Sequence, residues 1–400
     1  MEKLPTLLFF PQLRYLSNPT FSSVAKELKG YRRIYLDTDL YHNYESPISP
    51  DEMDELSGTY DEIIQLGLDK NLTNTGGRLS RLKRYHQLVK EIKALTTEYK
   101  PSAFIFPSDI IFELRVVKRH FPKIKRIILQ PCQRKFVLKK TSLRRKIYYY
   151  FFNYLIGIPL YSRSKMFGDQ DNKAHYVFWS KKWVASLAQP QKTITYISGA
   201  PAYDIIFKQE ANKSFVLPPQ FFSENKKIVT FFLNKKTSAG KEAFEEFASL
   251  YKAFIIQHPH LAFILKIHPL EDKEYCTNLF REVISPNVHL IDKELTTPQL
   301  LANSSIIITQ WSSIINEALI NDIPVVLCNP QGKHDLKNRF LDDFKYVAKT
   351  LAELIKLVDD ILLEKIDYSS FKGEYLENSI GFVDGQNSKR AAKIIETIIA

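Results

Sequence analysis

The stretch Ala262-Phe-Ile-Leu-Lys-Ile-His-Pro269 carries the signal that decides the fold. A short, continuous apolar run that is closed by a proline is typical of a strand buried on both faces. Helical patterns flank it, and further strand-like runs follow it: helices at 241–256 and 273–283, strands at 288–290, 305–309 and 324–327. Buried strands that alternate with helices predict parallel βαβ units, and therefore an α/β fold.

The first half of the chain has the same rhythm. We predict strands at 6–10, 33–36, 63–66, 103–106, 126–129, 174–178 and 193–197, helices at 18–28, 79–98, 110–119 and 181–187, and a proline-bearing loop at 37–58. The 400 residues exceed what one hydrophobic core supports. A polar stretch near 208–227 places the domain boundary, so we predict domains at 1–215 and 216–400. The apolar face of a terminal helix at 386–399 could also pack back on the first domain.

This pattern predicts two Rossmann-like, doubly wound domains that face each other across a cleft. Ligands of such sheets bind beyond the carboxyl ends of the strands. Hydrophobic residues make up 44% of the chain and charged residues 25%, which is typical of a globular protein. The cysteines Cys132, Cys276 and Cys328 lie far apart without metal-ligand spacing, so we expect neither disulfides nor zinc, and a reducing cytoplasm. No leader or membrane-spanning run is expected.

Polar loops follow three predicted strands of the second half. Asn234 and Lys235 open a small polar loop, in which backbone N–H groups and a cation would favour phosphate. An ordinary strand-to-helix turn is the alternative. In Lys266-Ile-His-Pro269, Pro269 ends the strand and presents His268, whose ring could donate a hydrogen bond to a phosphate. A structural histidine is the alternative there.

The third loop is Gln310-Trp-Ser-Ser-Ile-Ile-Asn-Glu317. Ser312 and Ser313 fall at the start of the next predicted helix, where hydroxyl and N–H groups can hold a phosphate. Glu317 lies one turn further and could accept a hydrogen bond from a ribose or sugar hydroxyl. A capping box that only stabilises the helix start is the alternative. Polar residues at three successive strand ends predict a nucleotide site.

The combination of Lys266-Ile-His-Pro with Ser312-Ser313 resembles the HP and paired-serine motifs of bacterial surface-polysaccharide transferases. These include CMP-sugar-dependent sialyl- and Kdo-transferases, and CDP-glycerol or CDP-ribitol phosphotransferases have a similar C-terminal half. The resemblance covers roughly residues 228–330, and it implies that His268 contacts the nucleotide phosphate while the serines contact the phosphate and ribose. Gly199-Ala-Pro-Ala-Tyr-Asp204 is similar to a turn that closes the N-terminal domain of many transferases with the two-domain GT-B fold. The resemblance therefore implies a GT-B architecture for the whole chain.

The first domain is expected to supply the acceptor side. Asp109 directly follows a predicted strand and is our candidate for a catalytic base or nucleophile, with a helix cap as the equal alternative. Gln130 and Gln133 follow the next strand and are candidate acceptor-side residues. Related transferases show Gln-His-Gly at this point, which this sequence lacks. We expect no metal or other cofactor, since no carboxylate pair stands at a suitable strand end.

Charge is concentrated in one segment. The net charge is +12, and between Glu113 and Asp169 fifteen basic residues occur without an acidic one. An aromatic run, Tyr148–Ile156, ends the basic stretch. Cations beside an aromatic-aliphatic helix favour an anionic membrane surface. We therefore predict that Lys139, Lys140, Arg144, Arg145 and Lys146 hold the protein at the inner face of the cytoplasmic membrane as a peripheral protein. A solvated basic face beside a buried helix is the alternative. No nucleic-acid-binding motif accompanies the charge, so we expect no nucleic-acid binding.

Together these patterns predict a glycosyltransferase that moves a sugar, Kdo or sialic acid, from a CMP-linked donor to a capsular, lipopolysaccharide or lipid-linked glycan. A CDP-glycerol or CDP-ribitol phosphotransferase is the alternative that uses the same pocket. A non-catalytic, membrane-associated assembly protein with a GT-B fold is the alternative outside enzymology.

Overall fold

The computed structural model of the chain describes residues 4–12, 14–42, 48–67, 78–132, 143–156, 158, 171–187, 190–208, 227–234, 240–333, 336 and 341–400. For residues 14–16, 40, 42, 78–81 and 145 it describes the backbone alone. The chain divides into two compact units. The first consists of Met1–Ile205 together with Asn378–Ala400, and the second of Ile206–Glu377.

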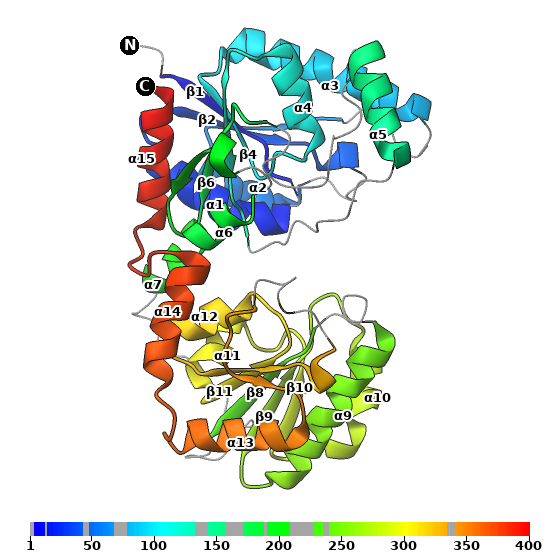
Figure 1. Cartoon of the computed structure of the whole chain (residues 1–400), viewed down its shortest axis with the longest axis vertical. Helices are drawn as coiled ribbons and strands as arrows, with labels where there is room; N and C mark the ends of the chain where they lie inside the picture. Colours follow the sequence, from blue (N-terminus) through cyan, green and yellow to red (C-terminus); the bar gives the residue numbers. More distant parts are fainter. Residues whose placement is uncertain are drawn as a thin grey trace. The chain divides into compact units, whose positions relative to one another are not determined.

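The first unit is built on a parallel sheet with the strand order β3-β2-β1-β4-β5-β6-β7. The interior strand β1 is apolar except for Thr6, and it is buried because strands flank it on both sides and helices cover the sheet (Figure 1). The strands are β1 (Thr6–Phe9), β2 (Arg32–Asp37), β3 (Glu62–Gln65), β4 (Ala103–Phe106), β5 (Lys125–Leu129), β6 (His175–Phe178) and β7 (Ile194–Ile197).

The helices of this unit follow the predicted order, with α2 and α7 as additions. They are α1 (Arg14–Glu27), α2 (Pro50–Ser57), α3 (Arg78–Tyr99), α4 (Phe112–His120), α5 (Leu143–Tyr150), α6 (Lys181–Ala185), α7 (Asp204–Lys208, which continues into the second unit) and α15 (Asn387–Ile399). The prediction of a loop throughout 37–58 is wrong, because α2 forms there. Ser49 and Glu52 make a reciprocal capping box that satisfies the first N–H groups of α2.

The second unit repeats the architecture with the strand order β10-β9-β8-β11-β12-β13, again fully parallel. Its strands are β8 (Ile228–Phe232), β9 (Ala262–Lys266), β10 (Val288–Ile291), β11 (Ile306–Thr309), β12 (Val325–Cys328) and β13 (Val347–Ala348). Its helices are α9 (Lys241–Gln257), α10 (Lys273–Phe280), α11 (Thr297–Asn303), α12 (Ile314–Ile320), α13 (Leu351–Leu362) and α14 (Tyr368–Ile380), which runs on into the first unit.

Helices cover both faces of the second sheet. On one face α9 and α13 bury Phe247, Tyr251 and Leu354 against Val229 and Phe231 of β8. On the other face a smaller core forms around α11. The short apolar runs seen in the sequence are therefore strands buried on both sides, and the predicted α/β fold with two Rossmann-like domains is confirmed.

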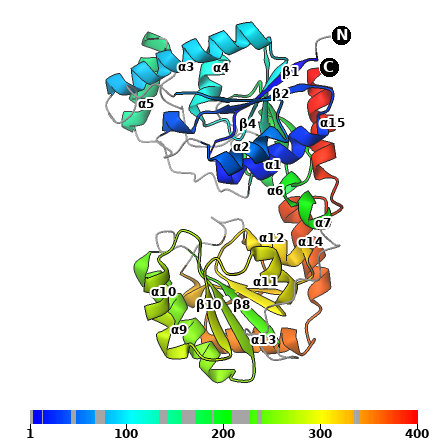
Figure 2. The same cartoon turned by 180° about the vertical axis from the view of Figure 1, so that it is seen from behind.

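The C-terminal segment completes the first unit. Residues of α15 (Ala391, Ile395 and Ile398) are buried in the same core as Leu7 and Phe9 of β1. Figures 1 and 2 show α15 against the first unit. The last helix of the chain is thus part of the core that the first strand begins.

A cap supplied from elsewhere in the chain starts α15. The two carboxylate oxygens of Asp204 accept hydrogen bonds from the backbone N–H groups of Asn387 (3.2 Å) and Ser388 (2.6 Å). Gly199 has a φ of +79°, and a Cβ on it would lie 1.8 Å from Asn387 Oδ1, so any other residue would strain the backbone and displace the Asn387 side chain. The Gly-x-Pro-x-x-Asp turn of the sequence therefore packs against the start of α15 and caps it.

We expect the substitution Asp204→Ala to loosen α15. Loss of an N-cap costs about 1–2 kcal/mol, so amide exchange in residues 387–399 should accelerate by roughly five- to thirtyfold while exchange in α9 stays unchanged. Hydrogen exchange read by mass spectrometry measures this. Asp367→Ala is the matched control, because Asp367 caps α14 in the same way but is exposed. Equal effects of both variants on α15 would contradict the assignment.

Candidate functional site

The strand order of the second unit places the candidate residues at one edge. β8 lies between β9 and β11, and the direction in which strands are added reverses between β8 and β11. Phe232 pairs with both Lys266 and Thr309, so the loops that follow these residues leave the same edge of the sheet. Such a reversal opens a crevice beyond the carboxyl ends of the strands, where ligands of doubly wound sheets bind.

His268 is held in a tight turn directly after β9. Its carbonyl oxygen accepts from the N–H of Glu271 (2.9 Å), and Pro269 occupies the second position of this turn. The ring Nδ1 accepts from the N–H of Leu270 (3.1 Å). Because Nδ1 is an acceptor, the neutral ring carries its proton on Nε2. The turn therefore sets both the position and the tautomer of the imidazole.

Lys266 stands at the last position of β9 and is half-buried. Burial lowers the pKa of Lys266, while the carboxylates of Asp292 and Glu294 beyond β10 act in the opposite direction. Glu294 accepts a hydrogen bond from Lys273 (2.7 Å), and the Lys273 ammonium lowers the pKa of Glu294 to about 2. A cation with two carboxyl groups close by thus borders the His268 turn.

Asn234 follows β8, one strand away from His268. It is only 6% exposed, and within the described residues its Nδ2 group has no hydrogen-bond acceptor. An unsatisfied buried N–H group is costly unless a ligand or neighbouring group accepts from it. The predicted neighbour Lys235 lies outside the described residues.

The loop after β11 carries the paired serines. Ser312 Oγ accepts from the N–H of Ile314 (3.4 Å), whereas Ser313 is exposed and makes no side-chain cap bond. The alternative of a capping box from Ser313 is therefore wrong, because the backbone of Ser313 is already helical. Trp311 packs edge-on against Phe247 of α9, with ring centroids 5.8 Å apart, and anchors the start of this loop.

Glu317 lies one turn into α12. Its carboxyl group is largely removed from solvent, and this burial raises its pKa to about 7. A carboxyl group in this state changes charge near neutral pH. It can donate a hydrogen bond when protonated and accept one when ionised.

Gln310 is a residue of this edge that the sequence did not indicate. It is fully buried behind the serine loop, and its side chain lies against the hydroxyl of Tyr251 on α9. Cys328, at the end of β12, lies on the same hydroxyl, and burial raises the pKa of both Tyr251 and Cys328. The alternation of side chains along β11 could have predicted that Gln310 lies on the sheet face covered by α9. It could not have predicted that Tyr251 and Cys328 lie beside it.

The acceptor-side candidates lie in the first unit. Asp109 has no exposed surface, and its Oδ2 accepts from the hydroxyl of Tyr176 (3.0 Å). Gln130 is also buried: its Oε1 accepts from the N–H of Trp179 (3.1 Å), and its Nε2 donates to the carbonyl of Cys132 (3.3 Å). In this structure both side chains hold β6 and its surroundings in place. Gln133 lies outside the described residues.

Of the basic candidates, Arg144 and Lys146 are exposed on α5. Lys139 and Lys140 lie outside the described residues, as does the side chain of Arg145. None of the described helices has the length and apolarity needed to cross a bilayer. Across the described part of the chain, no three histidine, cysteine or acidic side chains gather as metal ligands would.

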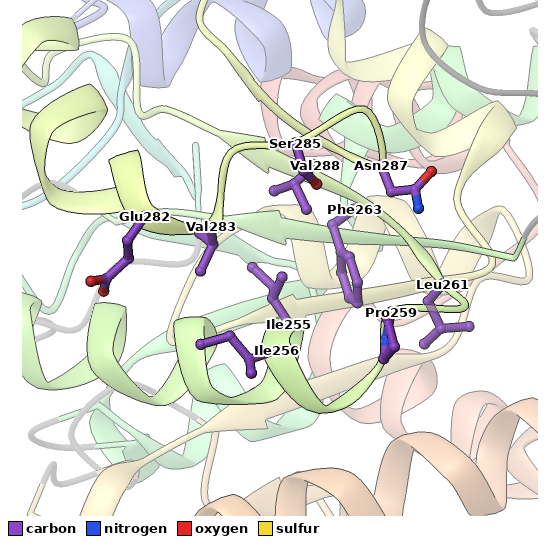
Figure 3. Close-up of a pocket in the computed structure, with 10 residues that line it drawn as sticks. All are labelled: Ile255, Ile256, Pro259, Leu261, Phe263, Glu282, Val283, Ser285, Asn287 and Val288. Atoms are coloured by element: carbon purple, nitrogen blue, oxygen red, sulfur yellow. The ribbon is translucent and has the colours of Figure 1, made fainter.

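A pocket in the second unit lies at the opposite edge of the sheet. Figure 3 shows Ile255 and Ile256 at the end of α9 near Phe263 and Val283, at the amino ends of β9 and β10. Its lining is mostly apolar, with Glu282 at one side. It is therefore separate from the polar edge that carries His268 and the serines.

Solved structures of an epimerase and of two glycosyltransferases share this fold along the full chain. The UDP-GlcNAc 2-epimerase from Neisseria meningitidis bound to UDP-GlcNAc is 14% identical, with 99% of each chain covered and a TM-score of 0.60. A glycosyltransferase from Rickettsia africae is 13% identical, with 100% of this chain and 99% of that chain covered and a TM-score of 0.62. The glycotransferase of kitacinnamycin is 14% identical, with both chains fully covered and a TM-score of 0.61. The fold is that of GT-B enzymes.

The model of the family CDP-Glycerol:Poly(glycerophosphate) glycerophosphotransferase matches residues 179–397, which is more than half of the chain and includes the whole polar edge described above. The chain belongs to this family of transferases. No curated protein sequence matches the chain.

Replacing Glu317 by glutamine should remove a pH dependence from the stability of the second unit. The raised pKa means that the folded state retains this proton better than the unfolded state, whose carboxyl titrates near 4.5. The stability that the protonated Glu317 provides is complete below pH 4.5 and is lost as the pH rises through 7. The free energy of unfolding of Glu317→Gln, relative to that of the native protein, should therefore rise by about 2–3 kcal/mol as the pH is raised from 4.5 to 8.

Urea unfolding followed by pulse proteolysis, with fragments of the second unit identified, measures this difference at each pH. Glu377→Gln is the matched control, because that side chain is exposed in the same unit. A constant difference between Glu317→Gln and the native protein across this range would show that Glu317 is ionised throughout.

Proposed function

We propose that this protein transfers a polyol phosphate, from a CDP-linked donor such as CDP-glycerol or CDP-ribitol, to a hydroxyl group of a cell-surface polymer or its lipid-linked precursor. The family match over residues 179–397 is the observation that carries the proposal, because it includes the strand ends at which His268 and the serines gather. Teichoic-acid polymers are the class of product that such a transfer builds.

In the proposed reaction an acceptor hydroxyl attacks the β-phosphorus of the donor. A new phosphorus–oxygen bond forms to the acceptor, and the bond from the β-phosphorus to the bridging oxygen breaks. CMP leaves with that oxygen, and the acceptor proton passes to a general base or to water. The negative charge that develops on the leaving phosphate is the charge that the site must stabilise.

The residues of the second unit suit this task. The Nε2–H of His268 is set by the turn to donate a hydrogen bond to a phosphate oxygen. Ser312 and Ser313 follow β11, about 10 Å away across two strand spacings, which a nucleotide can span. Asn234 lies between them with a buried N–H group to offer. Lys266 adds a cation.

Glu317 completes the proposed site as an acceptor for a ribose hydroxyl. A carboxyl group whose pKa is about 7 is partly ionised at neutral pH, and a hydroxyl donor would favour its ionised form. Nucleotide binding would therefore release a proton from Glu317.

A sugar transfer from CMP-Kdo or CMP-sialic acid is the second candidate. The HP and paired-serine motifs that support the proposal also occur in CMP-sugar transferases, and the leaving group is again CMP. The two reactions differ in the atom attacked: phosphorus in the first and the anomeric carbon of the sugar in the second. The family match favours attack at phosphorus.

We expect cytidine nucleotides to bind more tightly than uridine nucleotides. In calorimetric titrations His268→Ala should weaken CMP or CDP binding by about tenfold, which corresponds to one hydrogen bond to a charged phosphate. His260→Ala is the matched control, because His260 is exposed at the other edge of the same sheet and should leave affinity unchanged. Absence of binding by all four of CMP, CDP, UMP and UDP would contradict the assignment of the site.

The chemical nature of the product separates the two candidate reactions. With CDP-glycerol and a polysaccharide acceptor we expect release of CMP and a new phosphodiester, which ³¹P NMR of the purified product detects. A phosphate-free product formed from CMP-Kdo or CMP-sialic acid would replace the proposal with the sugar transfer. Nucleotide binding without turnover of any of these donors would favour the non-catalytic assembly protein.

A further inference from the structure

The carboxyl end of β11 carries an amide at a position where the fold favours an apolar side chain. Ile306 and Ile308 of β11 belong to the core that α9 covers, and Gln310 follows them in the same alternation. Gln310 has no exposed surface. In the part of the chain that the structure describes, neither its Oε1 nor its Nε2 has a partner in hydrogen-bonding geometry. A buried amide without partners costs stability, so packing alone does not explain this residue.

The polar group that faces this amide is on α9. The Tyr251 hydroxyl lies between the Gln310 side chain and Cys328 of β12. This hydroxyl is also buried, and among the described residues it too has no partner in hydrogen-bonding geometry. The Tyr251 ring is held against Phe231 of β8, with ring centroids 4.4 Å apart. The last torsion of a glutamine side chain is soft, so a rotation of the amide can align it with the hydroxyl.

The same helix supports the serine loop, Trp311–Ser313. Gln310 directly precedes this loop, and the Trp311 ring packs edge-on against Phe247, one turn before Tyr251 on α9. The backbone at Gln310 therefore sets the point from which the two serines extend. Groups that bind a ligand by hydrogen bonds must be held within about 0.5 Å of their place. Apolar packing is non-directional, whereas a hydrogen bond between an amide and a hydroxyl fixes a direction.

We propose that Gln310 is a positioning residue of the nucleotide site. In the nucleotide-bound protein its Nε2 group donates a hydrogen bond to the Tyr251 hydroxyl oxygen, and this bond holds the serine loop where Ser312 and Ser313 reach the phosphate. The bond forms when the phosphate binds, so part of the affinity depends on a side chain that does not touch the ligand. This role rests on the proposed function of the second unit, and it holds whichever group is transferred.

Calorimetric titration of the full-length protein with CMP and with cytidine tests this role. Gln310→Met keeps the length of the side chain and removes the amide. It should weaken CMP binding about fivefold, which corresponds to one neutral hydrogen bond. Cytidine lacks the phosphate, so the variant should bind it as the native protein does. The ratio of CMP affinity to cytidine affinity should therefore fall, which a general loss of structure would not produce.

The partner is tested by Tyr251→Phe and by the double variant. Tyr251→Phe should weaken CMP binding to the same extent, and Gln310→Met/Tyr251→Phe should weaken it no further, since both changes remove the same hydrogen bond. In urea unfolding without ligand, each single variant should be at least as stable as the native protein, because each loses a buried group that lacks a bond.

Tyr346→Phe is the matched control. The Tyr346 hydroxyl is also buried without a partner among the described residues, and it lies in the same unit, directly before the edge strand β13. Its loss should leave the affinity for CMP and for cytidine unchanged.

Three outcomes would overturn the positioning role. Gln310→Met could bind CMP as tightly as the native protein, or its affinity for CMP and for cytidine could fall equally. The effects of Gln310→Met and Tyr251→Phe on CMP binding could also add in full, which would show that the two side chains share no bond. Failure of the native protein to bind CMP is a separate result, because it contradicts the proposed nucleotide site itself.

Discussion

The parallel hydrogen-bonding of β8, β9 and β11 is the constraint on which the site depends. Each of these strands has neighbours on both sides and helices over both faces, so polar side chains have almost no place within them. Since all strands point the same way, the polar residues displaced to their carboxyl ends meet at a single edge. Lys266, at the last position of β9, shows how close to the core a charged residue can lie. It is half-buried, and this burial lowers its pKa.

The first unit depends on a contact between distant parts of the chain. Asp204 caps α15 through N–H groups that lie 183 and 184 positions further along the sequence. Gly381 has a φ of +83°, and a Cβ there would lie 2.2 Å from the carbonyl oxygen of Trp179. The segment that returns from the second unit is therefore fitted closely against the first. The core of the first unit is complete only when α15 has been made.

The sequence predicted those features that depend on neighbouring residues. Buried strands such as β4 and β9 are continuous apolar runs, and the His268 turn is marked by its proline. Features that depend on contacts across the fold could not be predicted in this way. The burial of Asp109 depends on Tyr176, and the burial of Gln130 on Trp179, and both partners come from the region of a different strand.

The failure to predict helix α2 has a different cause, because the residues that start this helix are neighbours in the sequence. Ser49, Pro50 and Glu52 form a helix start that can be recognised in the sequence. Two prolines and a polar composition led to the prediction of a loop, although a proline at the first position of a helix costs nothing. The positions of these residues at the start of the helix are therefore a better guide than the overall composition of the segment.

The tautomer of His268 bears on the kind of leaving group that the proposed site can favour. Because Nδ1 accepts from the N–H of Leu270, a doubly protonated ring would have to give up this bond. His268 is therefore suited to donate one directed hydrogen bond, while Lys266 and the buried amide of Asn234 supply charge and a further donor. In the proposed reaction, such a set would recognise the phosphate of CMP whichever group is transferred. Affinity for the nucleotide and choice of the transferred group are thus separate properties in this proposal, since the second depends on atoms beyond the bridging oxygen.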